Sequence, residues 1–278
     1  MPTSPPDRYG VMGYPVSHSR SPYIHHLFSK QTAQNIQYDL IEVPPDTLKS
    51  KIQQFRQKGG KGLNITLPYK RDVVAYIDDM SARASTAGAV NTLVFRDNTL
   101  YGDNTDGAGL VTDLENNQSF SIKGANILIL GAGGATRGIV GPLLEALACS
   151  IVITNRTFKK AIELADRFKS LGKVTASEIG ALTSQPSFNL IINATSAGLK
   201  GDTWLYPKSI VNPATLCYDL SYSESPTPFM LWASDLGAAK SLMGWGMLVE
   251  QAAESFFIWR GIQPNTKPIL EQLTVNTA

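Results

Sequence analysis

The stretch that decides the fold is Ile127-Leu128-Ile129-Leu130-Gly131-Ala132-Gly133-Gly134-Ala135. Four apolar residues followed by a glycine-rich turn are typical of a buried strand that turns directly into a helix. At such a helix start the backbone N–H groups and the helix dipole can face a pyrophosphate. Thr136 stands where the usual G-x-G-x-x-G pattern has its third glycine. On this stretch alone, a tight turn without a ligand therefore stays open as the alternative.

The residues that follow extend this pattern to a β-α-β unit. A segment of helical length covers residues 136–148, Ser150–Thr154 forms a second strand-like run, and residues 190–192 form another. Asn155-Arg156-Thr157 ends the second run, where a site for NAD usually has an acidic residue that binds the ribose 2′-OH. Because Arg156 suits a 2′-phosphate instead, we predict a Rossmann-type domain that binds NADP(H).

The first hundred residues form a separate α/β pattern. We expect strands at residues 9–12, 36–43 and 63–66, helices at 22–30 and 46–57, and a hairpin at 89–101. A helix within residues 104–114, capped by Thr105 or Asp106, would lead into the second domain. A long apolar helix at residues 246–259 would return the chain to pack against the first domain.

The predicted fold is therefore a two-domain α/β protein. Residues 1–105 plus 246–278 would form an N-terminal α/β substrate-binding domain, and residues 106–245 a Rossmann-type NADP-binding domain. A length of 278 residues and a hydrophobic content of 43% are consistent with two such cores.

Charge excludes two classes of partner. With 25 Lys and Arg against 23 Asp and Glu, no strong field draws the chain to nucleic acid or to a membrane surface. A small acidic molecule is the better candidate for a substrate. The first eight residues contain no apolar signal region, and no apolar run is long enough to span a membrane, so we expect a cytoplasmic protein.

The cysteines and histidines predict no metal site. Cys149 and Cys217 lie in apolar runs, which indicates core thiols rather than a disulfide framework or a metal-binding pair. His18, His25 and His26 have no companion set of ligands in the sequence.

Polar residues follow several predicted strands of the first domain. Ser19 and Ser21 precede a helix start with Pro22 in its first turn, so they either cap the helix or hold a carboxylate. Thr66 and Lys70 follow a strand on its carboxyl side, where ligands bind in α/β sheets. Taken singly, Lys70 reads as a solvated surface lysine, and the segment around Asp106 as ordinary turn and cap chemistry.

Eight segments, taken in order, resemble a known family. They are the Ser-x-Ser-Pro segment at 19–22 and the segments at 64–70, 88–92, 102–107, 131–135, 155–157, 193–196 and 246–253. With these residues the whole chain resembles the shikimate dehydrogenase family. The resemblance implies reversible NADPH-dependent reduction of 3-dehydroshikimate to shikimate, in the pathway to aromatic amino acids.

The resemblance also implies roles for individual residues. Lys70 and Asp106 would form the catalytic pair, in which the lysine gives a proton to the oxygen that gains negative charge during reduction. The substrate would be bound by Ser19, Ser21 and Tyr222 at its carboxylate and by Thr66, Asn91 and Gln251 at its ring hydroxyls. The pyrophosphate would lie on Gly131 to Ala135, the 2′-phosphate on Asn155, Arg156, Thr157 and Lys160, and the nicotinamide between Leu220 and Gly244.

One position departs from the family pattern, and two alternatives remain. Met243 precedes Gly244 where the family usually has an acidic residue. The first alternative is a quinate/shikimate dehydrogenase that accepts NAD, against which Arg156 argues. The second is a non-catalytic NADP-binding module, which Lys70 and Asp106 together disfavour. The sequence leaves the assembly open, with a homodimer as one alternative.

Overall fold

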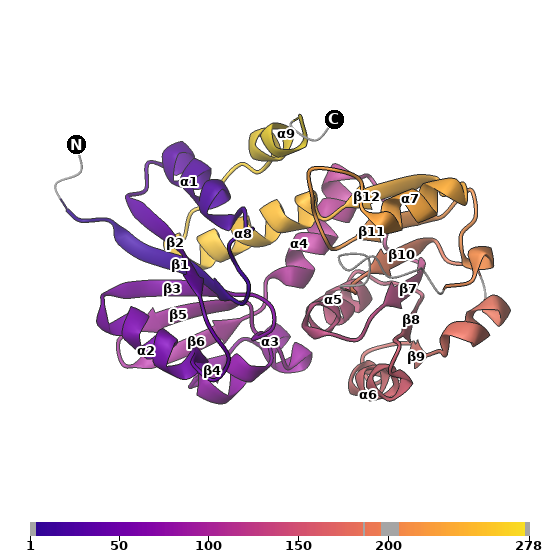
Figure 1. The fold of residues 1–278 in the computed structure, drawn as a ribbon, viewed down its shortest axis with the longest axis horizontal. Coiled ribbons are helices and arrows are strands. Elements are labelled where there is room, and N and C mark those ends of the chain that lie inside the picture. The colour runs from indigo at the N-terminus through magenta and orange to yellow at the C-terminus, as the bar shows by residue number, and fades with distance from the viewer. Residues whose placement is uncertain (1–3, 186, 196–205, 276–278) are drawn as a thin grey trace. The chain divides into compact units, whose positions relative to one another are not determined.

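The computed structural model describes residues 4–185, 187–195 and 206–275 (Figure 1). Contacts divide the chain into two compact units. Unit 1 comprises Met1–Gly109 and Leu248–Glu271, and unit 2 comprises Leu110–Met247 and Gln272–Ala278. The chain therefore passes into unit 2 within helix α4 (Asp106–Thr112) and returns within helix α8 (Trp245–Arg260).

Unit 1 is built on a mixed six-stranded sheet in the order β2-β1-β3-β5-β6-β4. Its strands are β1 (Asp7–Gly13), β2 (Ile36–Glu42), β3 (Gly60–Ile65), β4 (Asp79–Met80), β5 (Thr92–Arg96) and β6 (Thr99–Asp103). Its other helices are α1 (Ser21–Thr32), α2 (Leu48–Gln57) and α3 (Ala82–Ala87), and α9 (Lys267–Val275) follows α8. Strand β1 pairs in parallel with β2 and β3, so the loops after β1 and β3 leave the sheet at the same edge.

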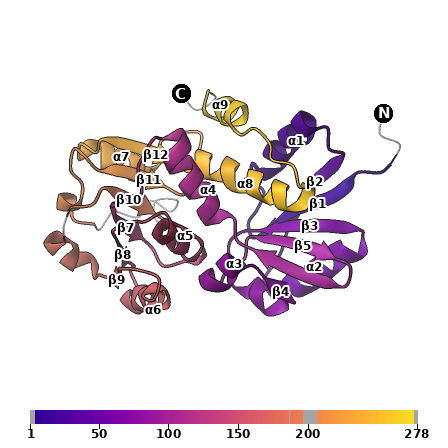
Figure 2. The same ribbon diagram turned by 180° about the vertical axis from the view of Figure 1, so that it is seen from behind.

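The two faces of this sheet bury different side chains. Helix α2 packs on one face through Leu48, Ile52 and Phe55, within a largely aliphatic core. Helices α1 and α8 lie on the opposite face, as Figures 1 and 2 show, and enclose aromatic rings. There the ring of His25 stacks on Tyr38 with centroids 4.1 Å apart.

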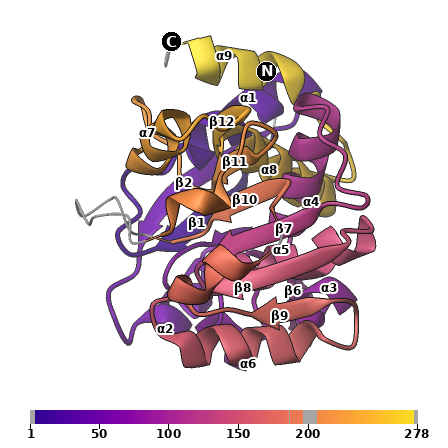
Figure 3. The ribbon, with the colours of Figure 1, turned by 90° about the vertical axis from the view of Figure 1, so that its right-hand side faces the viewer.

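Unit 2 is a parallel six-stranded sheet in the order β12-β11-β10-β7-β8-β9, which can be followed in Figure 3. Its strands are β7 (Asn126–Leu130), β8 (Ser150–Thr154), β9 (Val174–Ala176), β10 (Leu190–Asn193), β11 (Leu216–Asp219) and β12 (Lys240–Met243). Its helices include α5 (Gly134–Glu145), α6 (Phe158–Phe168) and α7 (Pro228–Asp235). The order reverses between β7 and β10, which is the switch point of a Rossmann fold.

Alternation along β7 explains the two cores of unit 2. Ile127 and Ile129 face one cluster, which contains apolar residues of α4, α5 and α6. Leu128 and Leu130 face the other, which contains residues of α7. Because both faces are covered, the strand is apolar throughout, as the sequence showed. The predicted fold class, two α/β domains of which one is Rossmann-type, is confirmed.

Two local expectations are corrected. Cys149 is exposed, because it follows the left-handed turn at Leu147 at the entrance to β8, whereas Cys217 is a core thiol whose pKa burial raises to about 12. Helix α4 starts at Asp106, and the Asp106 N–H donates to Asn104 Oδ1 rather than to a side chain of Thr105 or Asp106.

No helix in the described part of the chain is long and apolar enough to cross a membrane.

Candidate functional site

Lys70 and Asp106 form a close ion pair in unit 1. Lys70 follows the turn after β3, and Asp106 is the first residue of α4. Lys70 Nζ donates to both carboxylate oxygens of Asp106, at 2.9 and 2.7 Å, and the side chains are only 13% and 4% exposed. Removal from water strengthens such a pair and fixes the ammonium in one position. The site therefore holds a positioned proton donor.

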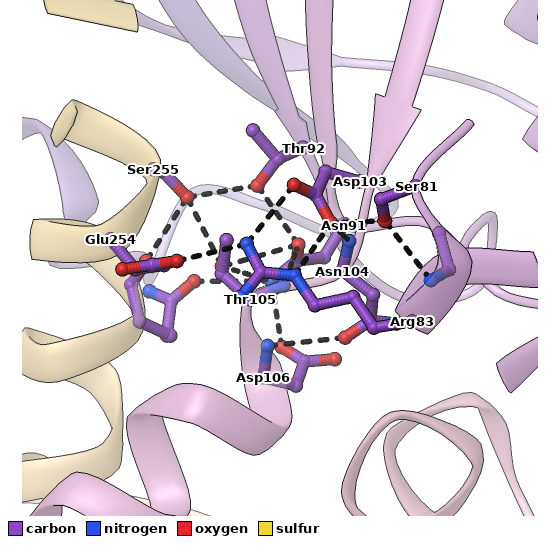
Figure 4. A network of polar contacts seen from close by, with 12 residues as sticks. Ser81, Arg83, Asn91, Thr92, Asp103, Asn104, Thr105, Asp106, Glu254 and Ser255 are labelled. Atoms are coloured by element: carbon purple, nitrogen blue, oxygen red, sulfur yellow. Dashed lines mark hydrogen bonds and ion pairs between the residues drawn. The ribbon is translucent and has the colours of Figure 1, made fainter. Parts of the chain in front are cut away.

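The carboxamide of Asn91 connects Asp106 of this pair to the loop after β6 (Figure 4). Asn91 Nδ2 donates to Asp106 Oδ1 at 2.9 Å, and Asn91 Oδ1 accepts the Thr105 backbone N–H at 2.8 Å. Because a backbone N–H can only donate, Oδ1 must face Thr105 and the amino group must face Asp106. Gln251 of α8 lies at the same amide, with Oε1 3.3 Å from Asn91 Nδ2.

A second ion pair fixes the strand end that precedes Asp106. Arg83 donates to both oxygens of Asp103, at 2.7 and 3.0 Å, and also contacts Glu254 at 2.9 Å (Figure 4). Burial acts to raise the pKa of the Asp103 carboxyl, but donation from Arg83 and Ser81 outweighs it and holds that pKa below its usual value. The charged Asp103 then accepts the Asn104 N–H at 2.7 Å. This contact fixes the backbone that leads to α4.

Ser19 and Ser21 lie in the loop after β1 and at the start of α1. Arg20 occupies the N-cap position without a side-chain cap, and Ser21 is the first helical residue. Ser19 Oγ accepts the Ser21 N–H at 3.3 Å, and the two hydroxyls are 3.2 Å apart. Ser21 is thus not the N-cap, and the two hydroxyls meet at a helix start, which favours a negatively charged ligand.

Thr66 follows β3, which pairs in parallel with β1, the strand that leads into that loop. Its N–H donates to Met12 O at 2.9 Å, and a Cβ on Gly13 would stand 2.4 Å from the Thr66 methyl group. Only glycine allows this close approach of the two segments. The Tyr14 N–H then donates to Leu67 O at 3.0 Å. The Ser19 loop and the Lys70 turn therefore leave the sheet as neighbours.

The glycine turn of unit 2 has the form expected for binding a phosphate group. Gly131 has φ +107°, a backbone conformation that favours glycine, and a Cβ there would lie only 3.0 Å from Ala194 O. The backbone conformation and the neighbouring carbonyl therefore both disfavour a side chain at this position. Gly133 is the N-cap of α5, whose first turn has no side-chain cap, and open space surrounds it. Thr136 is buried and donates to Gly131 O at 2.9 Å. This bond ties the first turn of α5 to the glycine turn.

The segment after β8 lies beside this turn, because β7 and β8 are paired. Asn155 joins them: its Oδ1 accepts the Ala132 N–H at 3.3 Å, and its Nδ2 donates to Thr157 O at 2.9 Å. The side chains of Arg156, Thr157 and Lys160 are exposed. Two exposed cations thus follow β8 close in sequence to Asn155, which contacts the turn before α5, and cations there suit a multiply charged phosphate ligand.

Leu220, Tyr222 and Gly244 follow the last two strands of unit 2. The Gly244 N–H donates to Ser221 O at 2.9 Å, and a Cβ on Gly244 would be 2.6 Å from Leu220 O. The ring of Tyr222 lies on Trp245, with centroids 4.7 Å apart. Met243 Sδ is 3.7 Å from the Ser223 hydroxyl. Tyr222 belongs to unit 2, whereas Ser19 and Ser21 belong to unit 1.

Sequence reasoning missed the support around Asn91. Thr92 and Ser255 are fully buried hydroxyls at this amide, and Arg83 on α3 holds Asp103 and is itself paired with Glu254 on α8. The available signal was Ser255, four residues after Gln251 and therefore on the same face of the predicted helix. Ser196, from the segment at 193–196, lies outside the described residues. Among the described residues, no group of three His, Cys, Asp or Glu side chains could hold a metal ion.

Three family models match successive parts of the chain. They are the shikimate dehydrogenase substrate binding domain at residues 11–93, shikimate / quinate 5-dehydrogenase at 113–200, and the shikimate 5′-dehydrogenase C-terminal domain at 244–274. A shikimate dehydrogenase (NADP(+)) from Methylococcus capsulatus is 48% identical over 96% of each chain.

Solved structures agree. An Ael1 enzyme from Pseudomonas putida matches with a TM-score of 0.89 and 41% identity, covering 96% of this chain and 98% of that one. Shikimate 5-dehydrogenase from Thermus thermophilus, in complex with NADP(H) and shikimate, matches with a TM-score of 0.86 and 30% identity, covering 97% and 99%. These similarities extend over both units.

Proposed function

The chain belongs to the shikimate dehydrogenase family, and we propose that it catalyses the reversible NADPH-dependent reduction of 3-dehydroshikimate to shikimate, in the pathway to aromatic amino acids. The observation that carries this proposal is the Lys70–Asp106 pair, with both carboxylate oxygens within 2.9 Å of one ammonium. A chain that had lost the chemistry would have no need to keep this pair and its supporting amide.

The residues of unit 2 fit NADP(H). Gly131 and Gly133 leave room for a pyrophosphate at the start of α5, where no side chain caps the helix. Arg156 and Lys160 are exposed cations that follow β8, the parallel neighbour of β7, and we assign them with Asn155 and Thr157 to the adenosine 2′-phosphate. Leu220 and Gly244 would flank the nicotinamide. Bound NADPH supplies the hydride.

Lys70 does two things in this mechanism. As the substrate carbonyl is reduced, its oxygen gains negative charge, which the Lys70 ammonium stabilises. The same Nζ then gives a proton to that oxygen, and in the oxidative direction it takes the proton back. Asp106 holds the ammonium in place through two hydrogen bonds. Because the oxidation of shikimate releases a proton, that direction should improve at higher pH.

The remaining polar residues orient the substrate. Ser19 and Ser21 would hold its carboxylate, supported by their meeting at the start of α1, and Tyr222 would assist. Thr66, Asn91 and Gln251 would bind the ring hydroxyls. In this proposal residues 1–105 with 246–278 form the substrate-binding domain, and residues 106–245 form the NADP-binding domain. We also propose a cytoplasmic location, with a homodimer as one alternative for the assembly that sedimentation can test.

The decisive assay follows NADPH absorbance with purified protein. Shikimate and quinate should each be tested with NADP and with NAD, because one matching family model covers quinate as well. We expect shikimate with NADP to give the highest kcat/KM. A preference for quinate with NAD would favour the broader enzyme, and binding of NADP without turnover of either acid would favour a non-catalytic module.

A double-variant cycle tests the catalytic pair. Lys70→Ala should lower kcat by about 10²–10⁴-fold with little change in the KM for shikimate, because the lysine acts mainly in the transition state. Asp106→Asn should also lower kcat, and the double variant should be little worse than the poorer single one. Losses that multiply would mean that the two residues act independently. A rise in KM alone would make Lys70 a binding residue.

A further inference from the structure

Three buried hydroxyls meet behind the Asn91 amide. Thr92, Thr105 and Ser255 have no exposed surface, and they come from β5, the loop before α4, and α8. Ser255 Oγ is 2.8 Å from Thr92 Oγ1 and 3.2 Å from Thr105 Oγ1 (Figure 4). The reaction described above uses none of these hydroxyls directly. Their burial around one amide indicates that they hold the Asn91 side chain in place.

Hydrogen-bonding capacity assigns a direction to each contact. Ser255 Oγ donates its single proton to the Gln251 carbonyl at 3.0 Å, since a carbonyl can only accept. In its contact with Thr105, Ser255 Oγ is therefore the acceptor, and the Thr105 hydroxyl can donate to Ser255 Oγ or to Asn91 Oδ1, each 3.2 Å away. The Thr105 oxygen in turn accepts from Asn91 Nδ2 at 2.9 Å. The chain of bonds thus runs from α8 to the amino group that faces Asp106.

The opposite end of the amide is held in the same way. Thr92 Oγ1 lies 2.9 Å from Asn91 Oδ1, beside the Thr105 N–H, and 2.8 Å from Ser255 Oγ, and it can donate its one proton to either oxygen. Asn64 Nδ2 lies 3.2 Å from Thr92 Oγ1 and 3.0 Å from Ser255 Oγ, which gives both hydroxyl oxygens a donor. With these contacts made, every polar atom around the amide has a partner.

We propose that Ser255 is a positioning residue for the Lys70–Asp106 pair, acting with Thr92 through the Asn91 carboxamide. Without the acceptor on Ser255, the Thr105 hydroxyl can donate only to Asn91 Oδ1, 3.2 Å away, and its lone pairs turn away from Asn91 Nδ2. The amide then keeps its contacts with the Thr105 N–H and Asp106 but loses one restraint, so it is held less firmly. A rotated amide would present an oxygen to the Asp106 carboxylate, which repels it and loosens the ion pair. The predicted effect on kcat rests on the proposed function, whereas the predicted effect on the orientation of the Asn91 amide does not.

The experiment compares volume-matched variants. Thr92→Val removes the hydroxyl at nearly constant volume, whereas Thr92→Ser keeps it, and Ser255→Ala removes the acceptor on α8. Ser29→Ala is the control, because Ser29 also donates to a main-chain carbonyl, Gln34 O at 2.6 Å, on a helix of the same unit. Each protein is assayed for kcat and KM, and the side-chain amide protons of Asn91 are followed by NMR in the ligand-free protein.

Ser255→Ala and Thr92→Val should each lower kcat about fivefold, the effect of one net hydrogen bond, with an unchanged KM for NADP. The Asn91 amide protons should shift and exchange faster with water in both. Thr92→Ser should restore most of the kcat lost in Thr92→Val, and Ser29→Ala should change neither readout.

The inference is overturned if Ser255→Ala and Thr92→Val lower the melting temperature but leave the Asn91 amide spectrum and kcat as in the wild type. In that case the hydroxyls only fill the core. Should the wild type show no activity with shikimate, the proposed function fails, while the NMR comparison still decides whether Ser255 orients the amide.

Discussion

His25 should make the protein unstable in mild acid. Its ring is completely buried between α1, the sheet of unit 1 and α8, with the rings of Tyr38 at 4.1 Å and Trp259 at 5.4 Å. Among the described residues, neither ring nitrogen has a hydrogen-bond partner. Burial lowers the pKa of His25 to about 3, and the neighbouring Asn64 side chain offsets only part of this effect. The ring is therefore neutral in the folded protein at all ordinary pH values.

The size of the effect follows from proton linkage. An unfolded histidine has a pKa of about 6.5, so between that pH and about 3 the unfolded chain binds a proton that the folded chain excludes. Stability is therefore lost as the pH falls below about 6.5, by about 1.4 kcal/mol for each pH unit. Between pH 7 and pH 5 the loss from His25 alone amounts to about 2 kcal/mol.

Urea unfolding at these two pH values measures this loss. His25→Phe keeps an aromatic ring in the aromatic layer and removes the titration, so its stability should fall by about 2 kcal/mol less than that of the wild type. All carboxylates contribute equally to both proteins and cancel in the comparison. His26→Gln is the matched control, because His26 is the exposed neighbour on the same helix. Equal losses in the wild type and His25→Phe, or an NMR titration of His25 near 6.5, would refute the reasoning.

Three further predictions test other parts of the protein. Arg156→Ala should raise the KM for NADP about tenfold or more with little change for NAD, because a charge-assisted contact is worth about 1.5–3 kcal/mol; an equal loss with both cofactors contradicts this role. Replacing Ser19 and Ser21 together by Ala should weaken shikimate binding but not NADP binding in fluorescence titrations. An unchanged affinity for shikimate would mean that the two serines only stabilise the turn before α1. Glu254→Gln should cost less than about 1 kcal/mol, because that side chain is 29% exposed, whereas Asp103→Asn, at 8% exposed, should cost about 2–3 kcal/mol; similar costs in urea unfolding would be inconsistent with this ranking.

Short-range pattern was enough for the Rossmann sheet and its ligand edge. The apolar run before Gly131 needs no distant partner to predict a strand, and the glycines restrict the following turn to a few conformations. Arg156 could be assigned to the same edge because parallel neighbours expose their carboxyl ends together. The first domain was also predicted as α/β, although Asn104 rather than a later residue supplies the oxygen at the start of α4.

Only the tertiary structure decided which polar side chains meet. Lys70 and Asp106 are 36 residues apart, and Thr92 and Ser255 are 163 apart, so their contacts depend on strand register and on the rotation of α8 about its axis. Neither quantity is encoded in a local pattern of apolar and polar residues. The same holds for His25, which looks like any other histidine in the sequence until α8 covers it. Sequence by itself thus determined the elements and the class of ligand, because these follow from contacts between near neighbours. The tertiary structure determined how Lys70 is buried and held by Asp106, because burial and hydrogen-bond direction arise only when distant segments pack.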